Sequence, residues 1–186
     1  MYGLINRSLK NMIQEKFGDY QWGEILQASG VPEDSFLTSM PYDDSLTYDL
    51  VGAASEVLDA SPETCLEMFG EYWVLSVAAK DYAALMDVTG TDMVTFISNL
   101  NSLHDRITSS FLDYVPPEFR LESLGDDSYR MDYISSRLGL SHFVLGILRG
   151  LAIHFNCQIE FLSIKPETVE SGSHVVFTFR QTAREG

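Results

Sequence analysis

The chain of 186 residues is long enough for one well-buried core, and its 45% hydrophobic and 21% charged residues are ordinary for a globular domain. A net charge of -15 argues against nucleic acid and an anionic membrane surface as partners, because both attract clustered Lys and Arg. No apolar run approaches the ~18 residues of a membrane-spanning helix, and residues 1–7 lack signal-peptide features. Because Cys65 and Cys157 are isolated, we expect reduced thiols, a cytoplasmic protein and no zinc site.

Helical spacing of apolar residues dominates the first 115 residues. It predicts helices over 4–17, 20–29, 46–58, 64–77 and 82–88, with capping residues at 43–45 and 61–64. A single long amphipathic helix over 93–111 follows, and its apolar face carries one imidazole, that of His104.

The pattern changes at Pro116 and Pro117, where helical spacing stops. Alternating residues then predict strands over 119–124, 129–135, 157–164 and 174–180, with an apolar helix over 140–155 between the second and third. The chain therefore reads as one α+β domain over 1–186. We expect a helical lobe to about residue 115 and a lobe with a four-stranded antiparallel sheet over 116–186.

Two features could carry chemistry. His104 is either a core histidine bonded to a backbone carbonyl or a metal ligand. Tyr133, Ser135 and Arg137 lie at alternate positions at the end of a predicted strand, so they form a donor array on one face. That array suits ligand carboxylates, or it is an exposed face on which Arg137 pairs with an acid such as Asp132.

Taken together, these features favour a cofactor. A histidine on a helix and a donor array for two propionates are what haem b requires of a protein, and no CxxCH sequence is present for covalent attachment. In this combination the sequence resembles the H-NOX family, the haem nitric oxide/oxygen-binding domains that also form the haem domain of soluble guanylate cyclase. The resemblance covers nearly the whole chain and rests on residues 1–6, 42–44, 47–51, 53–55, 69–71, 99–104, 116–117 and the YxSxR motif at 133–137.

The resemblance implies a role for each matching residue. His104 resembles the proximal ligand of the haem iron, and Tyr133, Ser135 and Arg137 resemble the propionate clamp. Pro117 matches the proline that presses the haem out of plane. Ile5 matches the N-terminal residue that packs against the haem. The family fold places haem between a helical distal lobe and a proximal lobe that carries the sheet.

The distal residues decide which gas is bound. Oxygen-binding members place a tyrosine donor over the ligand, and this position matches Phe143, which cannot donate; Leu9 and Trp73 match other distal positions. The resemblance therefore implies selectivity for nitric oxide, with carbon monoxide as a further ligand and oxygen excluded. Trp73 Nε1 is one donor that could change this. If the match to the family were shifted by one residue, His142 would stand in the pocket in place of Phe143; we expect His142 to face outward.

We therefore expect a gas sensor without catalytic activity. Nitric oxide would weaken the bond between the iron and His104 and shift one lobe against the other. No output motif is present, so the effector would be a separate protein such as a histidine kinase or a cyclic-di-GMP enzyme, as the resemblance implies for stand-alone bacterial members. The alternatives are an oxygen sensor or a haem enzyme that uses His142 or Trp73. A haem enzyme also needs a carboxylate behind the proximal histidine, and Asp105 points about 100° away. A third alternative is a haem-free regulatory fold.

Overall fold

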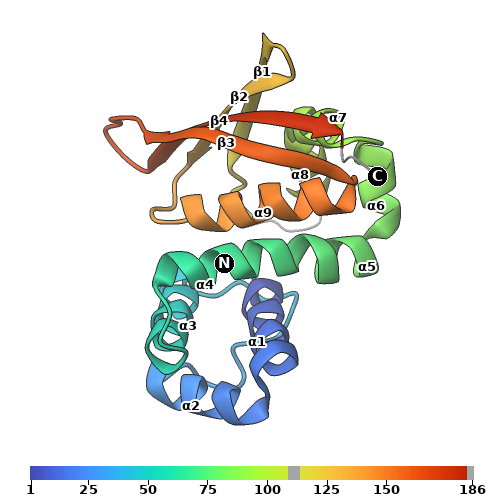
Figure 1. The fold of residues 1–186 in the computed structure, drawn as a ribbon. Coiled ribbons are helices and arrows are strands. Elements are labelled where there is room, and N and C mark those ends of the chain that lie inside the picture. The colour runs from blue at the N-terminus through green and yellow to red at the C-terminus, as the bar shows by residue number, and fades with distance from the viewer. Residues whose placement is uncertain (109–113, 184–186) are drawn as a thin grey trace.

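The structure is a computed structural model and describes residues 1–108 and 114–183. The chain is α+β, and Figure 1 shows a sheet with helix α9 beneath it, above a lobe made only of helices. The helices are α1 (Gly3–Phe17), α2 (Asp19–Ser29), α3 (Asp44–Val57), α4 (Pro62–Tyr72), the π-helix η1 (Trp73–Ala78), α5 (Ala79–Asp81), α6 (Ala83–Thr89), α7 (Met93–Ser98), α8 (Leu100–Thr108) and α9 (Ser141–His154). The strands are β1 (Glu118–Gly125), β2 (Ser128–Ser135), β3 (Cys157–Pro166) and β4 (Ser173–Ala183).

The sheet is antiparallel throughout, with the strand order β1-β2-β4-β3, so the predicted fold class is confirmed. Side chains alternate along β2: Met131, Tyr133 and Ser135 are buried, whereas Arg130 and Asp132 lie on the outer face. β4 is an inner strand, between β2 and β3.

The helix starts follow the sequence signals. Asp43 accepts a hydrogen bond from the Ser45 amide at 2.8 Å, as a cap of α3. Ser61 accepts from the Thr64 amide at 3.2 Å, with Pro62 in the first turn of α4. These caps satisfy backbone donors that the first helical turn leaves free, which is why both predicted starts are confirmed.

Two long predicted helices are interrupted. The predicted helix over 93–111 is wrong as a single helix: it divides at Asn99, whose side-chain amide donates to the Thr89 carbonyl at 2.8 Å, and residues 109–111 lie outside the described residues. The predicted helix over 64–77 changes from α to π at Trp73. Such π-helical insertions are frequent at functional sites.

The molecule has two hydrophobic cores, and the boundary between them differs from the predicted lobe boundary. One core joins α1, α2, α3 and α4 around side chains such as Met12, Ile25 and Leu50. The other joins α6, α7, α8 and α9 to the sheet, with Met93 and Phe177 among its fully buried members. The predicted lobe boundary near residue 115 is therefore wrong, because α6, α7 and α8 pack with the sheet. The two cores meet along α4, η1 and α9.

The crossing of α4 and α9 is close because both helices carry glycine there. A Cβ atom at Gly70 would lie 2.1 Å from the Phe143 carbonyl oxygen, and one at Gly146 would lie 2.1 Å from the Glu67 carbonyl oxygen. Only a residue without a side chain allows the two backbones to approach in this way. The crossing fixes Phe143 against α4.

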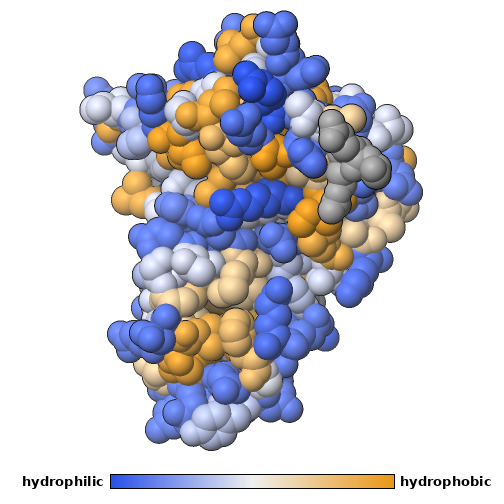
Figure 2. Space-filling view, viewed as in Figure 1, coloured by the Kyte–Doolittle hydropathy of each residue, from blue (hydrophilic) through white to orange (hydrophobic). Residues whose placement is uncertain are grey.

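Hydrophilic and hydrophobic residues are mixed on the face that Figure 2 shows, with hydrophobic groups gathered mainly over the sheet lobe. Among the described residues, no helix is both long enough and apolar enough to cross a membrane.

Candidate functional site

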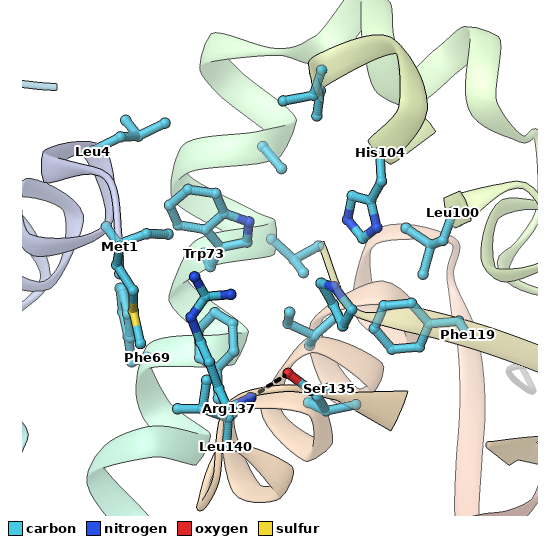
Figure 3. A pocket seen from close by; sticks show the side chains of 18 of the residues that line it. Met1, Leu4, Phe69, Trp73, Leu100, His104, Phe119, Ser135, Arg137 and Leu140 are labelled. Carbon is cyan, nitrogen blue, oxygen red and sulfur yellow. Dashed lines mark hydrogen bonds between the residues drawn. The ribbon is translucent and has the colours of Figure 1, made fainter. Parts of the chain in front are cut away.

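A cavity of about 340 Å³ lies between the two cores. Its walls come from α1, α3, α4, η1, α6, α7, α8, α9, β1 and β2, and its volume falls within the range of small-molecule pockets, ~300–1,000 Å³. Figure 3 shows Met1, Leu4 and Phe69 on one side of this cavity and Leu100, His104 and Phe119 on the other. The lining is overwhelmingly apolar, and no carboxylate belongs to it among the described residues.

His104 lines the cavity from the second turn of α8. Its ring lies 6.0 Å from the rings of Tyr114 and Phe119, measured between centroids. Burial lowers the pKa of His104, and the Pro117 backbone carbonyl and the Asp105 carboxylate oppose this shift only in part. His104 is therefore a neutral imidazole at neutral pH, which is the form that binds metals.

The Nδ1 atom of His104 is buried and has no hydrogen-bond partner among the described residues. The Pro117 carbonyl is near enough to influence the ring, but it makes no hydrogen bond of acceptable geometry to Nδ1. The carbonyl that a core histidine would use is therefore close to the ring, but it leaves Nδ1 without a hydrogen bond of good geometry. Buried polar atoms without partners are rare and mark sites where something else binds or moves.

The three donors predicted as a clamp do lie together. Tyr133 and Ser135 are buried and end β2, and Arg137 lies in the bend that follows, where its backbone amide donates to Ser135 Oγ at 3.1 Å (Figure 3). All three line the cavity. Burial raises the pKa of Tyr133, so its phenol remains protonated and can donate.

The guanidinium of Arg137 is held at the edge of the cavity. Its Nε donates to Asp44 Oδ2 at 2.7 Å and its Nη1 to the Val115 carbonyl at 2.8 Å. Asp44 also accepts from the Met1 ammonium group. Burial alone would raise the pKa of Asp44, but the hydrogen bonds from Met1 and Arg137 lower it below its usual range. No sequence pattern indicated this partner, because Asp44 lies 93 residues before Arg137 along the chain.

Asp132 is not the partner of Arg137, so that alternative is wrong. Asp132 accepts instead from Arg130 at 3.0 Å and contacts His174 Nε2 at 2.7 Å, on the outer face of the sheet. Arg137 therefore belongs to the cavity and not to the charged outer face.

The opposite wall is aromatic. Ile5, Phe69, Trp73 and Phe143 line the cavity there. The Phe69 ring lies 5.1 Å from that of Phe143 and 6.4 Å from that of Trp73. Leu9, which was expected among the distal residues, is 1% exposed in the core of the helical lobe and does not line the cavity.

His142 points away from the cavity, as predicted. Its Nδ1 lies 2.8 Å from Glu67 Oε1, its side chain is 40% exposed, and Glu67 also accepts from Arg149 on the same helix. This ion-pair cluster joins α9 to α4 on the outside of their crossing. His142 is thus not a distal ligand or acid-base group, and Phe143 occupies the position facing the cavity.

One pair of contacts next to the site was missed by the sequence analysis. The side-chain amide of Asn101 donates to the Phe119 carbonyl at 2.7 Å and accepts from the Phe119 amide at 2.9 Å. Asn101 lies one turn before His104 on α8, and Phe119 is the ring that packs against the imidazole. An asparagine in a helix gives no sequence signal for a partner 18 residues later.

The residues present fit a haem. An apolar cavity, a neutral imidazole on one wall, and a tyrosine, a serine and an arginine at one edge supply an axial ligand and donors for carboxylates. Phe143, Phe69 and Trp73 supply apolar surface for the macrocycle.

The comparisons with known proteins identify the class. The model of the Haem-NO-binding family matches residues 2–162, and the chain belongs to this family of H-NOX domains. Haem b is the cofactor that the family binds, and its members are gas-sensor domains without catalytic activity of their own.

Particular relatives agree with this assignment. Soluble guanylate cyclase gcy-31 of Caenorhabditis elegans is 26% identical over 82% of this chain and 22% of its own length. The soluble guanylate cyclase subunit beta-2 of Rattus norvegicus is 32% identical over 65% of this chain and 18% of its own length. The chain thus spans about a quarter or less of these relatives and corresponds to one region of each.

Solved structures show the same fold. A variant of the H-NOX protein from K. algicida in the unliganded Fe(II) state has a TM-score of 0.82 and 26% identity, over 98% of this chain and 97% of its own. An H-NOX protein from S. oneidensis in the Fe(II)NO state has a TM-score of 0.82 and 19% identity, over 98% and 99% of the two chains.

Proposed function

We propose that this protein is a nitric oxide sensor that binds the gas at ferrous haem b and signals to a separate effector protein. The observation that carries the proposal is the contrast across the cavity: a neutral histidine lies on one wall, and Phe143, which has no hydrogen-bond donor, lies on the other. Bound haem supplies the iron to which diatomic gases bind. The cavity contributes a mainly apolar environment, which no carboxylate lines among the described residues.

Each residue has a defined task in this proposal. His104 supplies the proximal imidazole, and the low pKa that burial gives it keeps the ring unprotonated. Tyr133, Ser135 and Arg137 bind the propionates through their donors, and Asp44 orients the guanidinium for this task. Pro117 and Ile5 also line the cavity and would contact the macrocycle.

Selectivity follows from the distal wall. Bound oxygen gains from a hydrogen-bond donor, whereas nitric oxide and carbon monoxide bind ferrous haem without one. Phe143 has no donor, and Glu67 holds the imidazole of His142 outside. The site therefore favours nitric oxide.

The signal passes through His104. No hydrogen bond from the described residues fixes its Nδ1, so α8 loses an anchor when the bond between His104 and the iron weakens. Two conformations of the sheet lobe relative to the helical lobe then differ in population, and the effector distinguishes them. The effectors that suit a stand-alone domain of this kind are a histidine kinase or a cyclic-di-GMP enzyme.

Trp73 supports a second candidate, an oxygen sensor. It lines the cavity, and no acceptor among the described residues takes its Nε1–H (Figure 3). An indole donor that reaches the bound gas would stabilise oxygen in place of a tyrosine.

The test is gas binding by the purified ferrous protein, compared with the Trp73→Phe variant. The sensor proposed here binds nitric oxide and not oxygen, and the variant behaves in the same way. Oxygen binding that disappears in Trp73→Phe would instead establish the oxygen sensor.

A further inference from the structure

We propose that Asn101 is a positioning residue that couples the movement of His104 to the sheet. The proposal rests on the proposed function and adds the route by which a change at His104 reaches β1 and β2. It is carried by the two hydrogen bonds between the Asn101 amide and the backbone of Phe119. We call this pair of bonds the Asn101 clip.

The clip takes the place of a strand. The amide and carbonyl of one residue point to the same edge of a strand, and β1 is an edge strand of the sheet. Asn101 satisfies both groups of Phe119 at 2.9 and 2.7 Å, as a neighbouring strand would. Backbone groups that an edge strand leaves unpaired are thereby attached to α8.

The clip acts on the residues around the imidazole. Asn101 and His104 are three positions apart on α8, so they lie on adjacent parts of one helix surface. The Phe119 ring, whose backbone is clipped, lies 6.0 Å from the imidazole and 5.6 Å from the Tyr133 ring on β2. Pro117, two residues before Phe119, lines the cavity beside His104.

The other contacts of this helix are weaker restraints. The imidazole has no hydrogen bond at Nδ1 among the described residues, and α8 is separated from α7 by the break at Asn99. Apolar contacts such as those of Leu100 and Leu103 are non-directional and tolerate sliding. The clip is a directional link between α8 and the sheet, so a shift of α8 pulls β1 and Pro117 with it.

The clip differs from a purely stabilising contact in one measurable respect. A stabilising contact, when removed, lowers the free energy of unfolding but leaves the response to nitric oxide intact. A coupling contact, when removed, uncouples two responses that normally occur together: the release of His104 and the change in β1 and β2.

The experiment compares Asn101→Leu and Asn101→Asp with the native protein. Leucine removes both hydrogen bonds. Aspartate keeps the shape and the acceptor for the Phe119 amide but loses the donor. The control is Asn99→Ala, which removes one amide-to-carbonyl bond, to Thr89 and not to β1. Absorption spectra report the release of His104 when nitric oxide is added. Hydrogen exchange measures the exchange rates of the backbone amides over residues 93–108 and 116–135, with and without the gas.

Before the gas is added, we expect the Phe119 amide to exchange about tenfold faster in Asn101→Leu than in the native protein, because its acceptor is gone. With the gas, we expect His104 release in all four proteins. The accompanying exchange change over 116–135 is lost in both Asn101 variants and kept in Asn99→Ala.

Three results would overturn the proposal. An unchanged response over 116–135 in both Asn101 variants, despite His104 release, would show that the clip does not couple. Loss of haem from both Asn101 variants but not from Asn99→Ala would show that it builds the site instead. Failure of the native protein to bind haem or nitric oxide would remove the proposed function itself, and the coupling with it.

Discussion

The two walls of the cavity are built differently. On the distal wall, α4 and α9 approach backbone to backbone at Gly70 and Gly146, and the rings of Phe69 and Phe143 are in contact. On the proximal wall, two short helices divided at Asn99 carry a histidine whose Nδ1 has no partner among the described residues. One wall is packed as a core, whereas the other is held by few directional contacts.

This difference matches the separate tasks of a sensor. A wall that selects a gas by the absence of a donor must keep its shape, and close packing resists rearrangement. A wall that reports binding must have two accessible arrangements, which elements with few buried contacts provide.

The largest effect is expected from His104→Gly. It removes the ring proposed to hold the iron, so we expect purification without stable haem and recovery of the haem spectrum when free imidazole is added. The measurement is the haem absorption band per protein. His142→Ala is the matched control and should keep its haem, because Glu67 holds His142 outside the cavity. Haem retained by His104→Gly without imidazole would contradict the assignment.

Gly146→Ala should damage the rigid wall. The new Cβ would lie 2.1 Å from the Glu67 carbonyl oxygen, so the helices must separate, at a cost of about 2 kcal/mol in the free energy of unfolding. Urea unfolding measures this. The control is Gly23→Ala in α2, where a Cβ meets nothing within 4 Å and alanine should stabilise by ~0.5–1 kcal/mol. Equal stability of the two variants would show that the crossing is not close-packed.

Phe143→Tyr should change gas selectivity while the fold is kept. The added hydroxyl places a donor in an apolar cavity, and a hydrogen bond to a charged or strongly polar acceptor is worth about 1.5–3 kcal/mol, or roughly tenfold or more in oxygen affinity. Oxygen titration followed by absorption measures it. An unchanged oxygen affinity, with nitric oxide binding intact, would mean that position 143 does not face the gas.

The smallest expected effect is a pH dependence of stability that arises from His104 on the proximal wall. Burial holds the pKa of His104 in the folded protein below its ordinary value of 6.5, so the unfolded chain takes up a proton that the folded haem-free protein does not. This contribution to stability is present above pH 6.5 and is lost as the pH falls through the folded pKa. Thermal unfolding of the haem-free protein between pH 8 and pH 5 should show it, and His104→Leu should lack it.

Local pattern predicted much of this arrangement. The resemblance to the H-NOX family placed Phe143 at the cavity and His142 outside it, and strand alternation brought Tyr133 and Ser135 to one face. The capping residues Asp43 and Ser61 predicted the starts of α3 and α4. The caps and the strand alternation depend on residues that are close along the chain, so they can be inferred from the sequence.

Features that depend on distant partners were not predicted. The pairing of Arg137 with Asp44 and the bonds of Asn101 to Phe119 join residues that only the fold brings together. The side-chain bond of Asn99 to Thr89, at the break between α7 and α8, also joins residues from different elements. Leu9 has the hydrophobicity of a cavity residue, but the angle of α1 directs it into the core.

The most direct test of the central claim is the visible absorption spectrum of the reduced protein under oxygen and then under nitric oxide. The account predicts a haem spectrum that oxygen leaves unchanged and that nitric oxide shifts to the form without a proximal histidine, with His104 as the residue released. A stable oxygen complex, or a nitric oxide complex that retains His104, would contradict it.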